Sequence, residues 1–229
     1  HPFAHLPCHR GGMSRIALIG GHGKVALLTI PLLVADGHEV TAIIRNPDHT
    51  AEVEELGAAA LVADVEQLTT DELVEVLRGH ESVIWSAGAG GGNPSRTFAV
   101  DRDAAIRSMD AAVAAAVRRY VMVSYAGAGP DHGIPEDDGF YAYAEAKAAA
   151  DAHLRRSALD WTVLGPSRLT SGDPTGRIEV IGEGVAKGEV SRANVAATIR
   201  CVLSAPGLAV RRTVEFNDGD TPVQEVFGA

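Results

Sequence analysis

The chain is poor in cysteine, in long apolar runs and in positive charge. Its 229 residues include two cysteines, Cys8 and Cys201, which are too few for a disulfide framework, so a reducing, cytoplasmic setting is expected. No apolar run approaches the roughly 20 residues that a membrane-spanning helix needs. The 20 lysines and arginines stand against 30 acidic residues, and the net charge of -10 disfavours nucleic acid and anionic membranes as partners.

Apolar residues are frequent enough for one packed domain. Hydrophobic residues make up 46% of the chain and charged residues 22%, so a sizeable core is expected and disorder is not. Residues 1–12 differ in composition from the rest, and Met13 comes just before the first strand-like segment. Residues 1–12 are therefore interpreted as a tail and residues 13–229 as the domain, for which no metal site is expected.

The most informative segment runs from Arg15 to Ile30, RIALIGGHGKVALLTI. Its apolar start predicts a buried strand, its glycines a tight turn, and its apolar end a helix. Gly20, Gly23 and Ala26 have the spacing G-x-x-G-x-x-A, in which glycines let a pyrophosphate approach the first helix amides closely. A second strand over residues 39–44 closes a βαβ unit, so a dinucleotide site is favoured over an ordinary turn.

Arg45 comes directly after this second strand. An acidic residue at that point of such a unit binds the ribose 2′-hydroxyl of NAD, whereas an arginine suits the 2′-phosphate of NADP. Arg45 therefore predicts NADP. The alternative is an arginine that is simply solvated after a strand.

Strand-like and helix-like segments alternate as far as about residue 165, which predicts an α/β fold with a doubly wound parallel sheet and right-handed crossovers. The glycine-rich loop 86–92 follows a strand, at the edge where ligands bind in such sheets. Residues 165–229 are too few for a second domain and are expected to form a small lobe over that edge. The expected ranges are strands at 58–63, 82–85, 120–124, 161–164, 178–181 and 213–216, and helices at 24–36, 51–57, 68–78, 98–117, 141–157 and 191–204.

Tyr143 and Lys147 stand four residues apart on one expected helix and so share a face. A lysine ammonium beside a phenol stabilises the phenolate and lowers the pKa of the phenol, which can then serve as general acid or base for a carbonyl–alcohol conversion. The alternative is a solvated face of an alanine-rich helix. Ser124 ends its strand, where it can donate a hydrogen bond to a substrate oxygen or be satisfied locally.

These features together resemble the short-chain dehydrogenase/reductases. The resemblance is closer to their atypical branch, the NmrA-like and NAD(P)H-binding proteins, which includes the NAD-dependent epimerase/dehydratase-like proteins. It spans about residues 14–217 and rests on the glycine pattern, Arg45, Asp64, the SAGAG loop, Ser124, Tyr143-Ala-Glu-Ala-Lys147, and the segments ALDWTVLGPSRLT and VSRANVAATI.

The resemblance implies a Rossmann fold that binds NADP, with NAD less expected, and hydride transfer from the nicotinamide C4. It implies that Tyr143 is the acid/base and that Lys147 holds the ribose hydroxyls and tunes Tyr143, with Ser124 and Asp101 as further catalytic candidates. The cofactor would be bound by Gly20, Gly21, His22, Gly23, Lys24, Val25, Arg45, Asp64, Val65, Ala87, Gly88, Ala89 and Lys147, with Pro166 and Ser167 flanking the nicotinamide.

Two positions depart from the family pattern. Asp101 stands where many relatives have the asparagine of a proton relay, although this branch often shows an aspartate there. Ser124-Tyr125 stands where relatives commonly have two serines, of which the second is catalytic. Because successive strand residues face opposite sides, either Ser124 or Tyr125 faces the substrate.

The expected function is that of an NADP-dependent oxidoreductase or epimerase acting on a small carbonyl or alcohol. The alternative is a non-catalytic NADP-binding sensor or regulatory protein of the NmrA-like type. The Tyr143/Lys147 pair favours the enzyme. Neither nucleic acid nor a membrane is expected as a partner, and the chain is either a monomer or a dimer.

Overall fold

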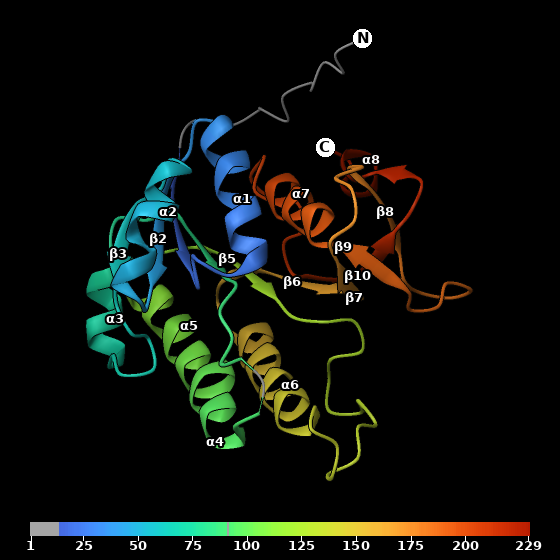
Figure 1. The fold of residues 1–229 in the computed structure, drawn as a ribbon, viewed down its shortest axis with the longest axis horizontal. Coiled ribbons are helices and arrows are strands. Elements are labelled where there is room, and N and C mark those ends of the chain that lie inside the picture. Colours follow the sequence, from blue (N-terminus) through green and yellow to red (C-terminus); the bar gives the residue numbers. More distant parts are fainter. Residues whose placement is uncertain (1–13, 91) are drawn as a thin grey trace.

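The computed structural model describes residues 14–90 and 92–229, and the predicted tail, Met13 and Gly91 lie outside them. Most of its strands belong to one nine-stranded sheet with the order β11-β8-β10-β6-β5-β4-β1-β2-β3 (Figure 1). These strands are β1 (Arg15–Ile19), β2 (Glu39–Ile44), β3 (Ala59–Val62), β4 (Ser82–Trp85), β5 (Arg119–Val123), β6 (Asp160–Pro166), β8 (Arg177–Val180), β10 (Arg212–Asp218) and β11 (Thr221–Pro222).

Neighbouring strands from β3 across to β10 all pair in parallel, and β8 and β11 add an antiparallel edge. The helices are α1 (Lys24–Ala35), α2 (Thr50–Glu55), α3 (Thr70–Leu77), α4 (Pro94–Thr97), α5 (Ala105–Ala114), α6 (Tyr141–Arg156), α7 (Arg192–Val202) and α8 (Val223–Phe227). The α1 and α7 helices pack together on one face, whereas α3, α5 and α6 cover the other (Figure 1). The predicted doubly wound Rossmann-type sheet is confirmed.

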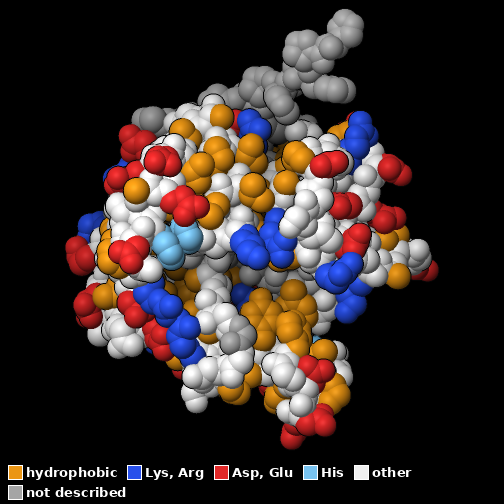
Figure 2. All heavy atoms as spheres, in the orientation of Figure 1, with side chains coloured by type: hydrophobic (Ala, Val, Ile, Leu, Met, Phe, Trp, Pro, Cys, Tyr) orange, Lys and Arg blue, Asp and Glu red, His pale blue; other side chains and the backbone are white. Residues whose placement is uncertain are grey.

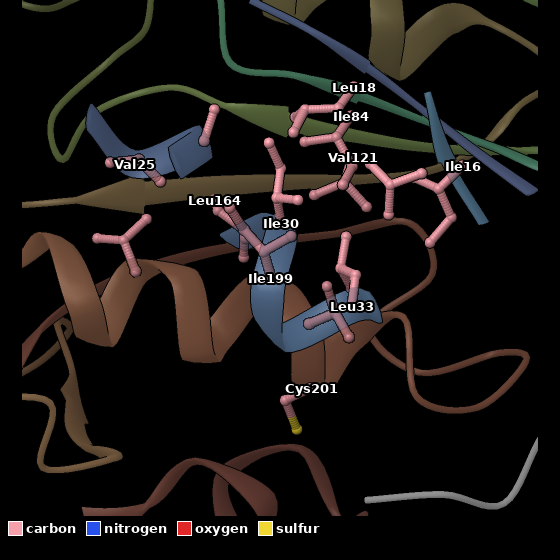
Figure 3. Packing of buried hydrophobic residues seen from close by; sticks show 14 of the residues in the cluster. Ile16, Leu18, Val25, Ile30, Leu33, Ile84, Val121, Leu164, Ile199 and Cys201 are labelled. Atoms are coloured by element: carbon pink, nitrogen blue, oxygen red, sulfur yellow. The ribbon is translucent and has the colours of Figure 1, made fainter. Parts of the chain in front are cut away.

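Two apolar layers hold the helices on the sheet. On one face, Ile30 and Leu33 of α1 and Ile199 of α7 pack toward the strand residues Leu18 and Val121 (Figure 3). The other layer lies between the sheet and the α3, α5 and α6 helices. The strands therefore read as nearly continuous apolar runs, as expected for a parallel sheet buried on both faces. No helix among the described residues has the length and apolarity to cross a membrane.

The segment expected as one helix over residues 98–117 is divided in the structure. The α4 helix starts earlier, because the side chain of Asn93 caps the amide of Arg96 at 3.2 Å and Pro94 occupies the first turn. A π-helical segment, Phe98–Ala104, then leads into α5. Such widened turns are rare and occur frequently at functional sites. This one carries Asp101 into the protein interior, where only 1% of the residue is exposed.

Much of the segment 165–229 continues the main sheet. The β10 strand pairs with β6 in parallel, and β8 pairs with β10. A two-stranded sheet, β7 (Arg168–Thr170) with β9 (Glu189–Ser191), is the smaller addition. The segment expected to be a small lobe is thus largely an extension of the sheet.

Candidate active site

A cavity of about 370 Å³ opens at the carboxyl ends of β1, β2, β3 and β4. The loops that follow these strands bound it, so segments distant in sequence meet at one edge of the sheet. This is the edge where doubly wound sheets bind ligands. Ten residues predicted to bind a cofactor line the cavity: Gly20, Gly21, His22, Gly23, Arg45, Asp64, Val65, Ala87, Gly88 and Ala89.

The glycines of the first loop have two different roles. Gly20 has a φ of +81°, and a Cβ there would lie 2.5 Å from the Ala87 Cα. A Cβ on Gly21 would lie 2.7 Å from the Cβ of Ala42, so both glycines are required for packing. A Cβ on Gly23 would meet only the carbonyl oxygens of Gly20 and Ser86, at 3.4 and 3.5 Å. Gly23 therefore leaves room for a ligand rather than for a neighbouring segment.

The α1 helix begins at this point with its amino end free of side chains that would compete with an anion. Gly23 is its N-cap, no side chain caps the helix, and its first turn has no acidic residue. The first amides and the positive end of the helix dipole are thus available to a phosphate. These residues fit the pyrophosphate of a dinucleotide. Lys24 is exposed in that first turn, whereas Val25 packs into the core, and neither lines the cavity.

Arg45 lies at the rim of the cavity, where β2 ends. Its side chain is exposed, and among the described residues it has no carboxylate partner. The guanidinium is therefore free to pair with a phosphate, as the sequence predicts. A solvated arginine has the same exposure, so the geometry is compatible with both interpretations of this residue.

The cavity also has lining residues that the sequence did not single out. Arg96 on α4 donates a hydrogen bond to the carbonyl of Ala89 at 2.6 Å and lies 3.4 Å from the carboxylate of Glu66. It therefore holds the glycine-rich loop in place. The sequence signal that could have placed Arg96 is the Asn93-Pro94 pair, which is typical of the start of a helix. The residues missed include Asn46, His49, Arg96 and Val100, whereas Ser86 and Gly90 belong to the glycine-rich loop that the sequence placed at this edge.

Tyr143, Lys147 and Asp151 follow one another at successive turns of α6. Lys147 is 1% exposed and donates a hydrogen bond to the Met122 sulfur at 3.0 Å, so the alternative of a solvated lysine is wrong. Burial lowers the pKa of Lys147, and the carboxylates of Asp151 and Asp101 oppose that shift. Lys147 and the two carboxylates form a buried cluster of ionisable groups, with Lys147 one helical turn from Tyr143.

Asp101 connects this cluster to the cavity. Its carboxylate accepts a hydrogen bond from the amide of Ala89 at 3.4 Å, and Ala89 lines the cavity. Burial raises the pKa of Asp101, while the ammonium of Lys147 and the Ala89 amide lower it. Asp101, which the resemblance placed in a proton relay, thus lies between the glycine-rich loop at Ala89 and the buried Lys147.

The expected effect of Lys147 on Tyr143 is not found. Burial raises the pKa of Tyr143 above its ordinary value of 10, and the carboxylates of Asp101 and Asp151 raise it further. The first physical reason is the burial of the phenol, and the second is that the same two carboxylates act on Lys147 and offset its charge. Tyr143 is accordingly held as a neutral phenol at pH 7.

Ser124 is satisfied inside the protein. Its hydroxyl donates a hydrogen bond of 2.6 Å to the buried carboxylate of Asp151, and it does not line the cavity. Tyr125, the next residue, packs on Tyr143 with ring centroids 5.5 Å apart and on Phe140 at 5.1 Å. The buried Tyr125 hydroxyl has no hydrogen-bond partner among the described residues. Of the two candidates, Tyr125 is therefore the one beside Tyr143 with an unused donor.

Pro166 and Ser167 lie at the carboxyl end of β6, outside the lining of the cavity. The Pro166 carbonyl accepts a hydrogen bond from the Ala126 amide at 2.9 Å, so it joins the loop after β5. The Ser167 hydroxyl is buried with no hydrogen-bond partner among the described residues. An unused donor at this edge is compatible with the predicted place beside the nicotinamide.

The sequence model of the NAD(P)H-binding family matches residues 20–206. The chain belongs to this family. A UPF0659 protein of Saccharomyces cerevisiae, YMR090W, is 31% identical to it, over 92% of this chain and 96% of the yeast protein. The uncharacterized sugar epimerase YhfK of Bacillus subtilis is 29% identical over 93% of this chain and 98% of its own.

A solved structure of similar shape supports the same assignment. It is that of a Bacillus halodurans protein named as an NAD-dependent epimerase/dehydratase, with a TM-score of 0.85 and 29% identity over 94% of this chain and 99% of that one. The chain is thus an NAD(P)H-binding protein of the epimerase and oxidoreductase type with a Rossmann fold. The resemblance found in the sequence is confirmed.

Proposed function

We propose that this NAD(P)H-binding protein is an NADP-dependent oxidoreductase that reduces a small carbonyl substrate to an alcohol. The observation that carries the proposal is the phenol of Tyr143, whose pKa is raised by burial and by the carboxylates of Asp101 and Asp151, together with the hydrogen bond that Asp101 accepts from the Ala89 amide in the lining of the cavity. A phenol that keeps its proton at pH 7 suits proton donation, which is what reduction of a carbonyl requires.

The cofactor is held by parts of the chain with separate tasks. The amino end of α1 at Gly23 binds the pyrophosphate, and Arg45 pairs with the 2′-phosphate that distinguishes NADP from NAD. When bound, the nicotinamide supplies the hydride.

Tyr143 gives its hydroxyl proton to the carbonyl oxygen as negative charge develops there. Burial lowers the pKa of Lys147 and the carboxylates of Asp151 and Asp101 oppose that shift, so we assign the lysine to the ribose hydroxyls of the cofactor rather than to the phenolate. Tyr125 holds the substrate oxygen with its unused hydroxyl, because the Ser124 hydroxyl is bonded to Asp151.

An epimerase is the second candidate, favoured by the similarity to the protein named as a sugar epimerase. In that case a substrate alcohol is oxidised and then reduced again, so no cofactor is consumed overall. A sensor that never turns over is less favoured, because it would have no need of a phenol and a buried lysine on one helix face.

Absorbance at 340 nm separates these functions. With NADPH and a panel of small aldehydes, ketones and keto sugars, a reductase loses absorbance in proportion to the alcohol formed. An epimerase converts a sugar into its epimer while the absorbance stays constant. If neither occurs with any member of the panel while NADPH still binds, the proposal of an enzyme is contradicted and the sensor is supported.

A further inference from the structure

Two histidines stack face to face at the mouth of the cofactor cavity. The rings of His22, in the loop before α1, and His49, in the turn after β2, have centroids 3.6 Å apart and an angle of 11° between their planes. Both histidines line the cavity, and so does Arg45, which precedes His49 by four residues in the sequence. Figure 2 shows histidine side chains exposed together on this face of the molecule.

The charged groups around the pair determine what it can bind. His22 Nε2 lies 2.5 Å from the Glu52 carboxylate on α2, whereas the ring nitrogens of His49 have no hydrogen-bond partner among the described residues. Asp48 precedes His49 in the chain, and the other charged groups lining the cavity are Arg45, Asp64 and Arg96. The part of the chain that the structure describes contains no group of three side chains arranged for a metal ion.

We propose that His22 and His49 bind the 2′-phosphate of NADPH together with Arg45, and that the imidazole of His49 takes up a proton from solvent when the phosphate binds. This inference rests on the proposed preference for NADP and adds the residues and the proton that enforce it. The preference for NADPH over NADH then grows as the pH falls.

The geometry supports a single proton. A phosphate dianion favours the charged form of a nearby imidazole, but two charged rings in stacking contact repel each other. Only one ring of the pair therefore takes up a proton when the phosphate binds, and the other ring stacks on it. Glu52 is paired with His22 Nε2, whereas the His49 ring nitrogens have no partner among the described residues and are free for the phosphate.

The sign of the pH effect follows from this linkage. Because the complex with NADPH holds one proton more than the free protein, its formation is favoured at lower pH, at most by about tenfold per pH unit. NADH has no 2′-phosphate and takes up no proton there. The range from pH 6.5 to 8.5 is suitable, because a phosphate monoester has its own second pKa near 6.

Isothermal titration calorimetry tests the proposal on the full chain. NADPH and NADH are each titrated at pH 7.5 in two buffers that differ in ionisation enthalpy, so that the difference in heat counts the protons exchanged. We expect net uptake of up to one proton with NADPH and none with NADH. We also expect the ratio of the two affinities to fall at least fivefold between pH 6.5 and 8.5.

The variant His49→Phe keeps a flat ring against His22 but cannot bind a proton. It is expected to lose both the proton uptake and the pH dependence of NADPH binding. His153→Phe is the matched control, since that histidine pairs with Asp110 outside the cofactor cavity, and it is expected to behave as wild type.

The outcomes distinguish this inference from the proposed function beneath it. NADPH bound more tightly than NADH, but with no proton uptake and an affinity ratio independent of pH, overturns the histidine proposal and leaves the role of Arg45 intact. Equal affinities for NADPH and NADH at every pH overturn the NADP preference itself. Uptake that persists in His49→Phe assigns the proton elsewhere and also overturns the proposal.

Discussion

Gly23 is the position at which cofactor binding can be removed without disturbing the fold. In Gly23→Ala, the new Cβ lies 3.4 and 3.5 Å from two carbonyl oxygens, and the backbone φ of -63° suits any residue. The thermal midpoint should therefore stay close to that of wild type. In Gly23→Val, the larger side chain extends from this position into the space over the amino end of α1.

The loss of affinity can be estimated from the contacts that the pyrophosphate would make. Hydrogen bonds to a charged group contribute about 1.5–3 kcal/mol each. If Val at this position removes one or two of them, the dissociation constant for NADPH rises by about tenfold to about twenty thousandfold. Gly23→Ala is expected to have an intermediate effect, because a single methyl only narrows the approach to the helix.

Gly20→Ala serves as the matched variant, since its effect should be the reverse. Its Cβ would lie 2.5 Å from the Ala87 backbone and its φ is +81°, so stability falls before binding is affected specifically. Calorimetric titration with NADPH and thermal unfolding, measured on all three variants, give both quantities. If Gly23→Val binds NADPH as wild type does, the first glycine loop is only a structural turn and the reasoning is refuted.

Three further predictions concern other parts of the site. Arg45→Ala should weaken NADPH binding at least tenfold and leave NADH binding unchanged in fluorescence titrations, and an unchanged preference would show that the 2′-phosphate lies elsewhere. Ser124→Ala should lower the free energy of unfolding in urea by about 1.5–3 kcal/mol, because it removes the hydroxyl that donates to the buried carboxylate of Asp151. A change near zero would mean that this hydrogen bond is not formed in solution. Burial raises the pKa values of Tyr120 and Tyr143, so the stability that their neutral forms contribute is present below pH 10 and is lost as the pH rises further. Unfolding free energies at pH 9 and 11 should therefore fall less in Tyr143→Phe than in wild type, and equal falls would contradict the assigned burial.

The sequence predicted the parts of this molecule that depend on local pattern. The first strand, the glycine turn and α1 follow one another within 21 residues from Arg15 to Ala35, and the four loop residues predicted from Gly20 to Gly23 all line the cavity. Arg45 could be placed at the cavity because the carboxyl end of β2 lies beside the glycine turn in a βαβ unit. Spacing along a helix likewise placed Lys147 one turn from Tyr143 and showed which face they share.

What the sequence did not reveal depends on segments that meet only in the folded chain. The Tyr143 pKa shifts upward because the phenol is buried, and the carboxylates of Asp101, carried inward by a π-helical segment, and of Asp151 raise it further. His49 faces His22 because the turn after β2 folds back toward the first loop. The pairing of β10 with β6 could not be predicted, because the sequence of a strand does not determine which strand lies beside it in the sheet.

The proton donor is the central claim, and turnover by Tyr143→Phe tests it most directly. NADPH consumption at 340 nm is measured for wild type and variant with the most active carbonyl of the panel, and NADPH affinity is measured alongside. We expect the variant to lose at least a hundredfold in turnover, as is typical when a general acid is removed, while its affinity for NADPH stays the same. A variant that consumes NADPH at the wild-type rate would contradict the account.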